Sequence, residues 1–261
     1  MIRAIFFLLL LHSNSLIKGQ NPVPHPFLQS ILAHNDYQKS QPFLNAYAHG
    51  VGVIEVDLFY HDGEVLVAHD AAETVHNASF KKLYLKPLKK IMRARSGPYP
   101  NTSNRLALMF DIKNHREEIM GFIISLYNDN PHIFGPIEGQ ENLIPIIISG
   151  LRPNISTWGD LPPGIMIDGR LSDDIPPVLR HKVYMVSSSY SAVGNWDGKG
   201  ECPDEEKAKL AATIQKVHDE NLKIRFWGAK DVPEMWDLLM NYEVDILGVD
   251  HLDDFKQWLE K

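Results

Sequence analysis

Short apolar runs alternate with helix-like segments along nearly the whole chain, and this alternation limits the fold more than any other feature. Eight strand-like runs begin at Ser30, Val51, Arg105, Leu143, Gly164, Lys182, Leu222 and Val244. Helical patterns lie between most of them, notably over residues 42–49, 204–220 and 232–242. Strands that alternate with helices form βαβ units and a parallel sheet. Eight such units predict an α/β protein, a TIM-type (β/α)8 barrel.

Three further patterns refine this expectation. The pair Asp62-Gly63 separates residues 51–59 from the run at 64–68, which predicts a hairpin with an extra antiparallel strand. A doubly wound open sheet is the rival arrangement, but no glycine-rich phosphate loop follows the first run, which disfavours its dinucleotide-binding form. Residues 70–104 are weakly patterned, and we expect them to cover one mouth of the barrel. No linker divides the chain, so a single domain over residues 20–261 is expected.

The first residues resemble a targeting segment. A weakly basic start with Arg3, an apolar run over residues 5–11 and a polar stretch before Gln20 predict a signal peptide over residues 1–19. An uncleaved anchor is the alternative. No later stretch is apolar enough to span a bilayer, so the mature chain is expected to have no transmembrane segment and to be exported, either periplasmic or secreted.

Composition excludes several classes of protein. The formal net charge is −7, which argues against nucleic acid as a partner. The one cysteine, Cys202, excludes an intrachain disulfide and a cysteine-based metal cluster. We expect a monomer.

Polar and aromatic side chains stand where several of the strand-like runs end: His34 and Asn35, Glu55 and Asp57, His69, Asp111 and Lys113, Arg225 and Trp227, and Asp250. Residues two apart on a strand point to the same side, and catalysis in a TIM barrel takes place at the carboxyl ends of the strands. The sequence therefore predicts one site to which these side chains contribute.

The residue types in this set indicate phosphoryl chemistry. Three converging carboxylates, Glu55, Asp57 and Asp111, would repel one another unless a cation lay between them. All-oxygen ligation favours one divalent cation, Ca²⁺ or Mg²⁺, over zinc. Two histidines beside such a site suit general acid–base catalysis near neutral pH, and nearby lysine and arginine side chains would neutralise an anionic substrate.

The segments that carry these residues are similar to a known superfamily. "AHNDY" at residues 33–37, "GVGVIEVDLFYHDGEVLVAHD" at 50–70 and "LMFDIK" at 108–113 resemble the glycerophosphodiester phosphodiesterases and phosphatidylinositol-specific phospholipases C. "LKIRFWGAKD" and "VDILGVDHLDDF" resemble the last two strands of that superfamily, so the resemblance spans roughly residues 31–255. It implies a phospholipase C-like TIM barrel.

The resemblance also implies a role for each residue of the site. His34 and His69 match the catalytic histidine pair, and Glu55 and Asp57 match two metal ligands. Asp111 stands where the family usually has a glutamate and is expected to be the third carboxylate ligand. Lys113 matches the lysine beside the substrate phosphate, Trp227 matches an aromatic residue at the seventh strand end, and Arg225 is expected to bind substrate.

Two features depart from the usual glycerophosphodiesterase pattern. Asn35 follows the first histidine where those enzymes have an arginine. The metal-dependent phosphoinositide phospholipases have an asparagine there that binds calcium, so Asn35 is expected to be a fourth ligand. The segment between His69 and Asp111 is also short for a substrate-capping insertion. The His-Asn-Asp-Tyr form resembles an exported branch of the superfamily.

The function expected from these observations is metal-dependent hydrolysis of a phosphodiester. Substrates of glycerophosphodiester or phosphoinositide type would be cleaved with His34 as base and His69 as acid. Cleavage would give a cyclic phosphodiester, which either is the final product or is opened by water. The partner would be a small phosphodiester or a lipid headgroup. The alternative is a catalytically weak barrel that binds lipid headgroups or sugar phosphates. A metal-dependent amidohydrolase is disfavoured because the first strand lacks a His-x-His pair.

Overall fold

The computed structural model describes residues 26–76, 79–95, 97–99, 104–136, 138–139 and 142–261. The expected signal peptide over residues 1–19 lies outside the described residues, so it stays a prediction. Among the described residues, no helix has both the length and the apolar character needed to cross a bilayer.

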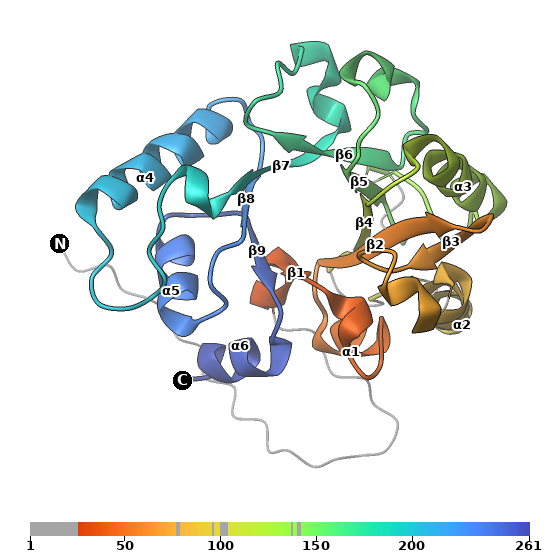
Figure 1. Ribbon diagram of the computed structural model, residues 1–261, viewed down its shortest axis with the longest axis horizontal. Helices are drawn as coiled ribbons and strands as arrows, with labels where there is room; N and C mark the ends of the chain where they lie inside the picture. The colour runs from red at the N-terminus through yellow and green to blue at the C-terminus, as the bar shows by residue number, and fades with distance from the viewer. Residues whose placement is uncertain (1–25, 77–78, 96, 100–103, 137, 140–141) are drawn as a thin grey trace.

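Eight parallel strands form a closed ring, seen from one end in Figure 1. They are β1 (Ile31–Ala33), β2 (Val53–His61), β4 (Ala107–Ile112), β5 (Ile146–Gly150), β6 (Ile165–Arg170), β7 (Val183–Ser189), β8 (Ile224–Trp227) and β9 (Ile246–Val249). The short strand β1 closes the ring, because Leu32 pairs with Val53 of β2 on one side and with Gly248 of β9 on the other. All eight predicted strands are present, and the TIM barrel is confirmed.

A ninth strand, β3 (Glu64–Val67), pairs antiparallel with the far end of β2. Asp62 and Gly63 form the two-residue turn with φ angles of 48° and 84°, the left-handed conformations that such a turn requires. The hairpin predicted from Asp-Gly is therefore confirmed. It extends β2 beyond the barrel and brings His69 back toward the strand end.

Helices surround the barrel (Figure 1). The α-helices are α1 (Leu44–His49), α2 (Lys86–Arg95), α3 (Arg116–Asp129), α4 (Asp204–His218), α5 (Pro233–Asn241) and α6 (Leu252–Leu259). Shorter helical turns are η1 (Pro26–Ser30), η2 (Asp36–Gln38), η3 (Glu73–His76), η4 (Lys81–Leu85), η5 (Ile155–Asp160), η6 (Pro177–Lys182) and η7 (Tyr190–Ala192). The 3-10 turns η5 and η6 stand in the β5–β6 and β6–β7 connections, where the described chain has no α-helix.

The hydrophobic core has two layers, because successive side chains of a strand point to opposite faces. The inner layer fills the barrel and contains Leu32, Val53, Met109, Ile147 and Met185. The outer layer packs between the strands and the surrounding helices. Above the inner layer, toward the carboxyl ends of the strands, the same inward register carries polar residues, and these form the candidate site.

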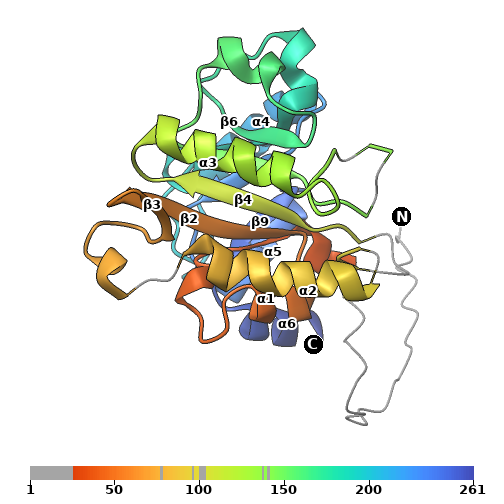
Figure 2. The same cartoon turned by 90° about the vertical axis from the view of Figure 1, so that its right-hand side faces the viewer.

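We expected residues 70–104 to cover one mouth of the barrel. This expectation was wrong for η4 and α2, which lie within that segment. The π-helical turn η4 leads directly into α2, and together they form the crossover helix on the outer face of the barrel. Figure 2 shows α2 and α3 along the outside of β2 and β4. Phe80, Tyr84 and Leu88 are fully buried there, and the ring of Phe80 meets that of Phe110 from β4 edge-on at 5.1 Å between centroids.

Candidate active site

Three carboxylates meet at the carboxyl ends of β2 and β4. Asp57 stands opposite Asp111 in the register of the two strands, and Glu55 lies two residues before Asp57 on the same face. One oxygen from each of the three lies within 4.8 Å of the others. Glu55 and Asp57 are only 4% and 2% exposed. The structure thus brings together the three residues that the sequence predicted as metal ligands.

The Glu55 side chain indicates that this cluster suits a cation. Its Oε2 atom is buried and has no hydrogen-bond partner among the described residues. Burial raises the pKa of Glu55, and the nearby charges of Arg225 and His34 oppose that increase. A buried carboxylate oxygen without a donor is costly, and an all-oxygen cluster matches the preference of Ca²⁺ and Mg²⁺.

Two basic side chains face the carboxylates. Lys113 Nζ lies 2.9 Å from Asp111 Oδ2 and 3.1 Å from Asp57 Oδ2. Burial lowers the pKa of Lys113, but the two carboxylates outweigh it and the net pKa is raised. Arg225 is buried, with its Nη2 atom 3.9 Å from Glu55 Oε2. Trp227, two residues further along β8, is 47% exposed at the strand end.

His34 lies on one side of the cluster, directly after β1. Its Nδ1 atom is 2.8 Å from Asp250 Oδ1, and its Nε2 atom is 3.6 Å from Glu55 Oε2. Burial lowers the pKa of His34, but the Asp250 hydrogen bond and the charges of Glu55 and Asp250 outweigh burial, so the net pKa is raised. With Nδ1 committed to Asp250, Nε2 is the ring atom that would meet a substrate.

His69 has the same arrangement on the hairpin side. Its Nδ1 atom lies 2.8 Å from Asp57 Oδ2, and its side chain is 58% exposed. Its backbone N–H donates to Glu73 Oε2 at 2.8 Å, which holds the turn after β3. Each histidine therefore has Nδ1 next to a carboxylate. Asp57 belongs to β2, whereas Asp250 directly follows β9.

Asn35 follows His34, and its amide nitrogen faces His34 and Asp250. The Nδ2 atom donates to Asp250 Oδ1 at 3.3 Å and lies 3.0 Å from His34 Nδ1. The residue has a left-handed backbone, with φ at 50°, a conformation that asparagine tolerates better than most residues. Its role as a fourth ligand stays a prediction.

Sequence reasoning assigned no role to two residues that contact the site. Asp250 ends the last strand, a position that was visible in the sequence, but its pairing with His34 was not. Tyr37 stands inside the "AHNDY" segment, and its hydroxyl donates to Asp57 Oδ2 at 3.0 Å. Asp231 in turn fixes the turn after β9, because its Oδ2 atom accepts from the backbone N–H groups of Asp250 and His251.

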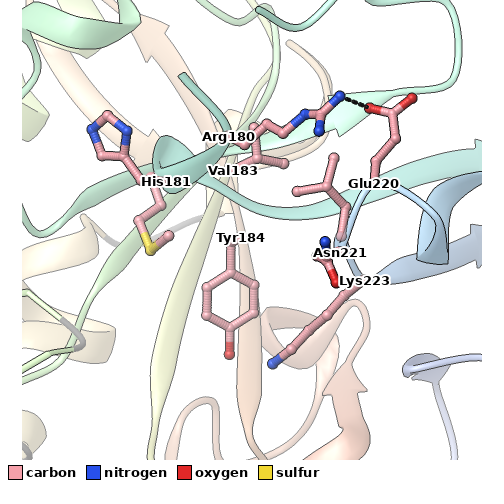
Figure 3. Close-up of a pocket in the computed structure, with 9 residues that line it drawn as sticks. Arg180, His181, Val183, Tyr184, Glu220, Asn221 and Lys223 are labelled. Atoms are coloured by element: carbon pink, nitrogen blue, oxygen red, sulfur yellow. Dashed lines mark hydrogen bonds and ion pairs between the residues drawn. The ribbon is translucent and has the colours of Figure 1, made fainter. Parts of the chain in front are cut away.

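Figure 3 shows the residues that line a separate cavity, which has a volume of about 460 Å³. Residues at the amino-terminal ends of β6, β7 and β8 line it, among them Arg180, Tyr184, Glu220 and Lys223. None of the predicted site residues contributes to it. Because chemistry in this architecture takes place at the carboxyl ends of the strands, the cavity is not the candidate active site.

The closed parallel barrel, with an acidic cluster and two histidines at its carboxyl end, agrees with the class that the sequence resembles, the phospholipase C-like TIM-barrel phosphodiesterases. Comparison with known proteins agrees with this class. Residues 26–144 match the model of the AIM6-like phosphodiesterase domain. The chain is 25% identical to altered inheritance of mitochondria protein 6 of Eremothecium gossypii, over 87% of this chain and 69% of that protein. It is 21% identical to the homologue of that protein from Arthroderma benhamiae, over 92% of this chain and 84% of the homologue.

Solved structures share the fold. A glycerophosphodiester phosphodiesterase from Parabacteroides distasonis superposes with a TM-score of 0.56 at 13% identity, over 88% of this chain and 96% of that chain. The glycerophosphodiester phosphodiesterase from Agrobacterium tumefaciens gives a TM-score of 0.51 at 12% identity, over 89% of this chain and 100% of that chain. These structures show the shared fold. The match to the AIM6-like phosphodiesterase domain confirms the resemblance to the superfamily and supports a phosphodiester-related function. The exported branch stays a prediction.

Proposed function

We propose that this protein is a divalent-cation-dependent phosphoric diester hydrolase that acts on glycerophosphodiester or phosphoinositide-type substrates. One observation carries the proposal: two histidines, each with Nδ1 bound to a carboxylate, stand on either side of a buried acidic cluster. The AIM6-like phosphodiesterase match supports it. A structural neighbour also supports it, a phosphodiesterase from Oleispira antarctica in complex with the product sn-glycerol-3-phosphate. The two structures share a TM-score of 0.50 and 15% identity, over 90% of this chain and 98% of that chain.

Glu55, Asp57 and Asp111 would hold the cation, with the amide oxygen of Asn35 as the fourth ligand. When bound, Ca²⁺ or Mg²⁺ supplies Lewis-acid chemistry, lowering the pKa of a substrate hydroxyl and neutralising charge on phosphate. The charges in the site agree with this. Three carboxylates against Lys113 and Arg225 leave one net negative charge. A divalent cation turns that into one positive charge, which a singly charged phosphodiester balances.

The histidines would move the protons. His34 takes the proton of the neighbouring hydroxyl at Nε2, that oxygen forms a bond to phosphorus, and the bond to the leaving alcohol breaks. His69 gives its Nε2 proton to the leaving oxygen. The product is a cyclic phosphodiester, which water opens when the two histidines exchange roles.

The basic and aromatic side chains complete the site. Lys113 lies between Asp57 and Asp111 and is close enough to the cluster to stabilise negative charge that develops on phosphate. Arg225 mainly balances the charge of Glu55 from within the barrel. The exposed Trp227 offers an apolar surface to the alcohol portion of the substrate.

The histidine variants test the proposal. Purified wild-type protein, His34→Ala and His69→Ala are incubated with glycerophosphocholine, glycerophosphoinositol and phosphatidylinositol, and the products are followed by ³¹P NMR. Each variant is expected to lose about 10²–10⁴-fold in turnover. The matched control is His132→Ala, an exposed histidine on a distant loop, which should retain full activity. Wild-type turnover in either site variant would contradict the assignment. A wild-type protein that binds these diesters without cleaving them would instead support a binding barrel.

We also propose that the chain is exported after removal of residues 1–19 and that residues 20–261 act as a monomeric domain. The apolar run near the amino terminus supports export. Expression of the full chain in eukaryotic cells, followed by amino-terminal sequencing of the protein in the medium, tests it. Retention of Met1 on the mature protein would contradict it.

A further inference from the structure

Tyr37 is the last residue of the "AHNDY" segment, and the proposed function leaves it without a role. The segment leaves β1 at His34, and the left-handed backbone of Asn35 then turns the chain into the short helical turn η2. Tyr37 lies within this turn, half-buried against the outer core. It is therefore three residues from one catalytic histidine and close to the carboxylate that binds the other.

The neighbouring Asp36 fixes the turn in place. Asp36 is 1% exposed, and its Oδ2 atom accepts hydrogen bonds from the Phe43 backbone N–H at 2.6 Å and from the Tyr84 hydroxyl at 2.9 Å. Phe43 and Tyr84 come from the approach to α1 and from η4, so the turn is tied to two separate elements. The backbone that carries Tyr37 thus has a defined position relative to the barrel.

Three donors converge on one oxygen of Asp57. The Tyr37 hydroxyl lies 3.0 Å from Asp57 Oδ2, His69 Nδ1 lies 2.8 Å from it, and Lys113 Nζ lies 3.1 Å from it. These donors come from the turn after β1, the loop after β3 and the end of β4. Because the terminal torsion of an aspartate side chain is soft, its hydrogen-bond donors determine how the carboxylate is turned.

The tyrosine hydroxyl suits the role of a permanent donor. A tyrosine hydroxyl carries one proton at neutral pH and can donate it in a single hydrogen bond. Gln38 Nε2 lies 3.4 Å away and donates to the same hydroxyl, which leaves the hydroxyl proton directed at Asp57.

We propose that Tyr37 is a positioning residue that fixes the Asp57 carboxylate, so that one oxygen orients His69 while the other stays available to a divalent cation. The cleavage part of this inference rests on the proposed function. The cation-binding part does not, because it concerns only how Asp57 is held. Without the hydroxyl, Asp57 rotates more freely, and both the cation and His69 lose a fixed partner.

The test compares Tyr37→Phe, which removes one oxygen and keeps the ring, with Tyr127→Phe as a matched control. Tyr127 lies on α3, and its hydroxyl accepts from the Gly164 backbone N–H at 3.2 Å, away from the site. Calorimetric titration of each protein with Ca²⁺ and with Mg²⁺, in the absence of substrate, measures cation affinity directly. Thermal unfolding and circular dichroism confirm that both variants are folded.

Tyr37→Phe is expected to weaken cation affinity about 10–100-fold, the usual effect of removing a residue that holds a metal ligand. With a diester substrate, its kcat should fall by a similar factor while KM stays within about twofold of the wild-type value. Tyr127→Phe should match the wild type in both measurements, whatever it does to thermal stability.

Wild-type cation affinity in Tyr37→Phe would overturn the inference, and so would an equal loss in Tyr37→Phe and Tyr127→Phe. If the wild-type protein binds cations but cleaves no diester, the proposed function fails, yet the titration still decides the role of Tyr37. A wild-type protein that binds neither cation would overturn both.

Discussion

The Nδ1 atom of His34 lies 2.8 Å from Oδ1 of Asp250, although 216 residues separate the two in sequence. They meet because the barrel closes by pairing β1 with β9, and the backbone N–H of His34 donates to Val249 O at 3.0 Å. Closure of the barrel therefore positions one of the two histidines that we propose as acid and base. This pairing gives His34 a fixed tautomer and a fixed direction for Nε2.

Asp250→Asn removes the charge of this partner and keeps its shape. Because the hydrogen bond to Asp250 raises the pKa of His34, the substitution should lower that pKa and reduce turnover by about 10²-fold or more. NMR titration of the His34 ring and the pH profile of kcat/KM measure both effects. Asp253→Asn, whose carboxylate lies 3.0 Å from His49 Nε2 on the surface, is the control and should change neither. Unchanged turnover in Asp250→Asn would contradict the proposed role.

Gly150→Ala should damage the carboxylate cluster from the neighbouring strand. Gly150 ends β5 with φ at 67°, and a Cβ atom there would stand 2.0 Å from Asp111 Oδ1 and 2.4 Å from Ile112 O. We expect a loss of about 1–3 kcal/mol in the free energy of unfolding and weaker cation binding, because Asp111 must move.

Gly63→Ala separates backbone strain from displacement of Asp111. Gly63 has φ at 84°, and a Cβ atom there would have no heavy atom within 4 Å. This variant should lose stability but keep the cation affinity of the wild type. Chemical denaturation and calorimetric titration give the two quantities for each variant, and equal cation affinity in both would show that Asp111 is not displaced.

Much of the barrel could be predicted because its strands are largely apolar runs, and several of these runs end in a polar residue. The period of two along β2 placed Glu55 and Asp57 on one face, and parallel pairing placed Asp111 beside them. The hydrogen bonds that join the two ends of the chain could not be predicted in the same way. The His34–Asp250 and Tyr37–Asp57 contacts depend on barrel closure and on the left-handed turn at Asn35, neither of which has a local periodic signal.

The helix formed by η4 and α2 was not predicted, and the reason lies in one residue, Pro87. Pro87 lacks a backbone N–H and normally marks the end of a helix. In the structure, the π-helical turn η4 ends at Leu85, and Pro87 becomes the second residue of α2, which continues directly from η4. Pro87 therefore stands where two helical segments join, although proline by itself normally signals a break.

The ion pair between Arg152 and Asp173 should make stability depend on pH in the acid range. Burial raises the pKa of Asp173, but the hydrogen bonds from Arg152 and from the Arg170 backbone N–H outweigh burial and lower the net pKa below 3.8. A lowered folded-state pKa means that the stabilisation is complete above about pH 4 and disappears as pH falls through the folded-state pKa.

Asp173→Asn should consequently cost about 1–3 kcal/mol at pH 7 and progressively less below about pH 4. Urea denaturation at a series of pH values measures the difference from the wild type. Asp160→Asn, an exposed residue at the end of η5, should show no such dependence. A penalty for Asp173→Asn that is the same at pH 3 and pH 7 would contradict the account.

The central claim is that Glu55, Asp57 and Asp111 hold a divalent cation between the imidazoles of His34 and His69. The most direct test is diester turnover, followed by ³¹P NMR, for protein dialysed exhaustively against a chelator and then supplied with Ca²⁺ or Mg²⁺. Turnover should be lost on chelation and restored by one of the two ions. Turnover that is unaffected by exhaustive chelation would contradict the claim.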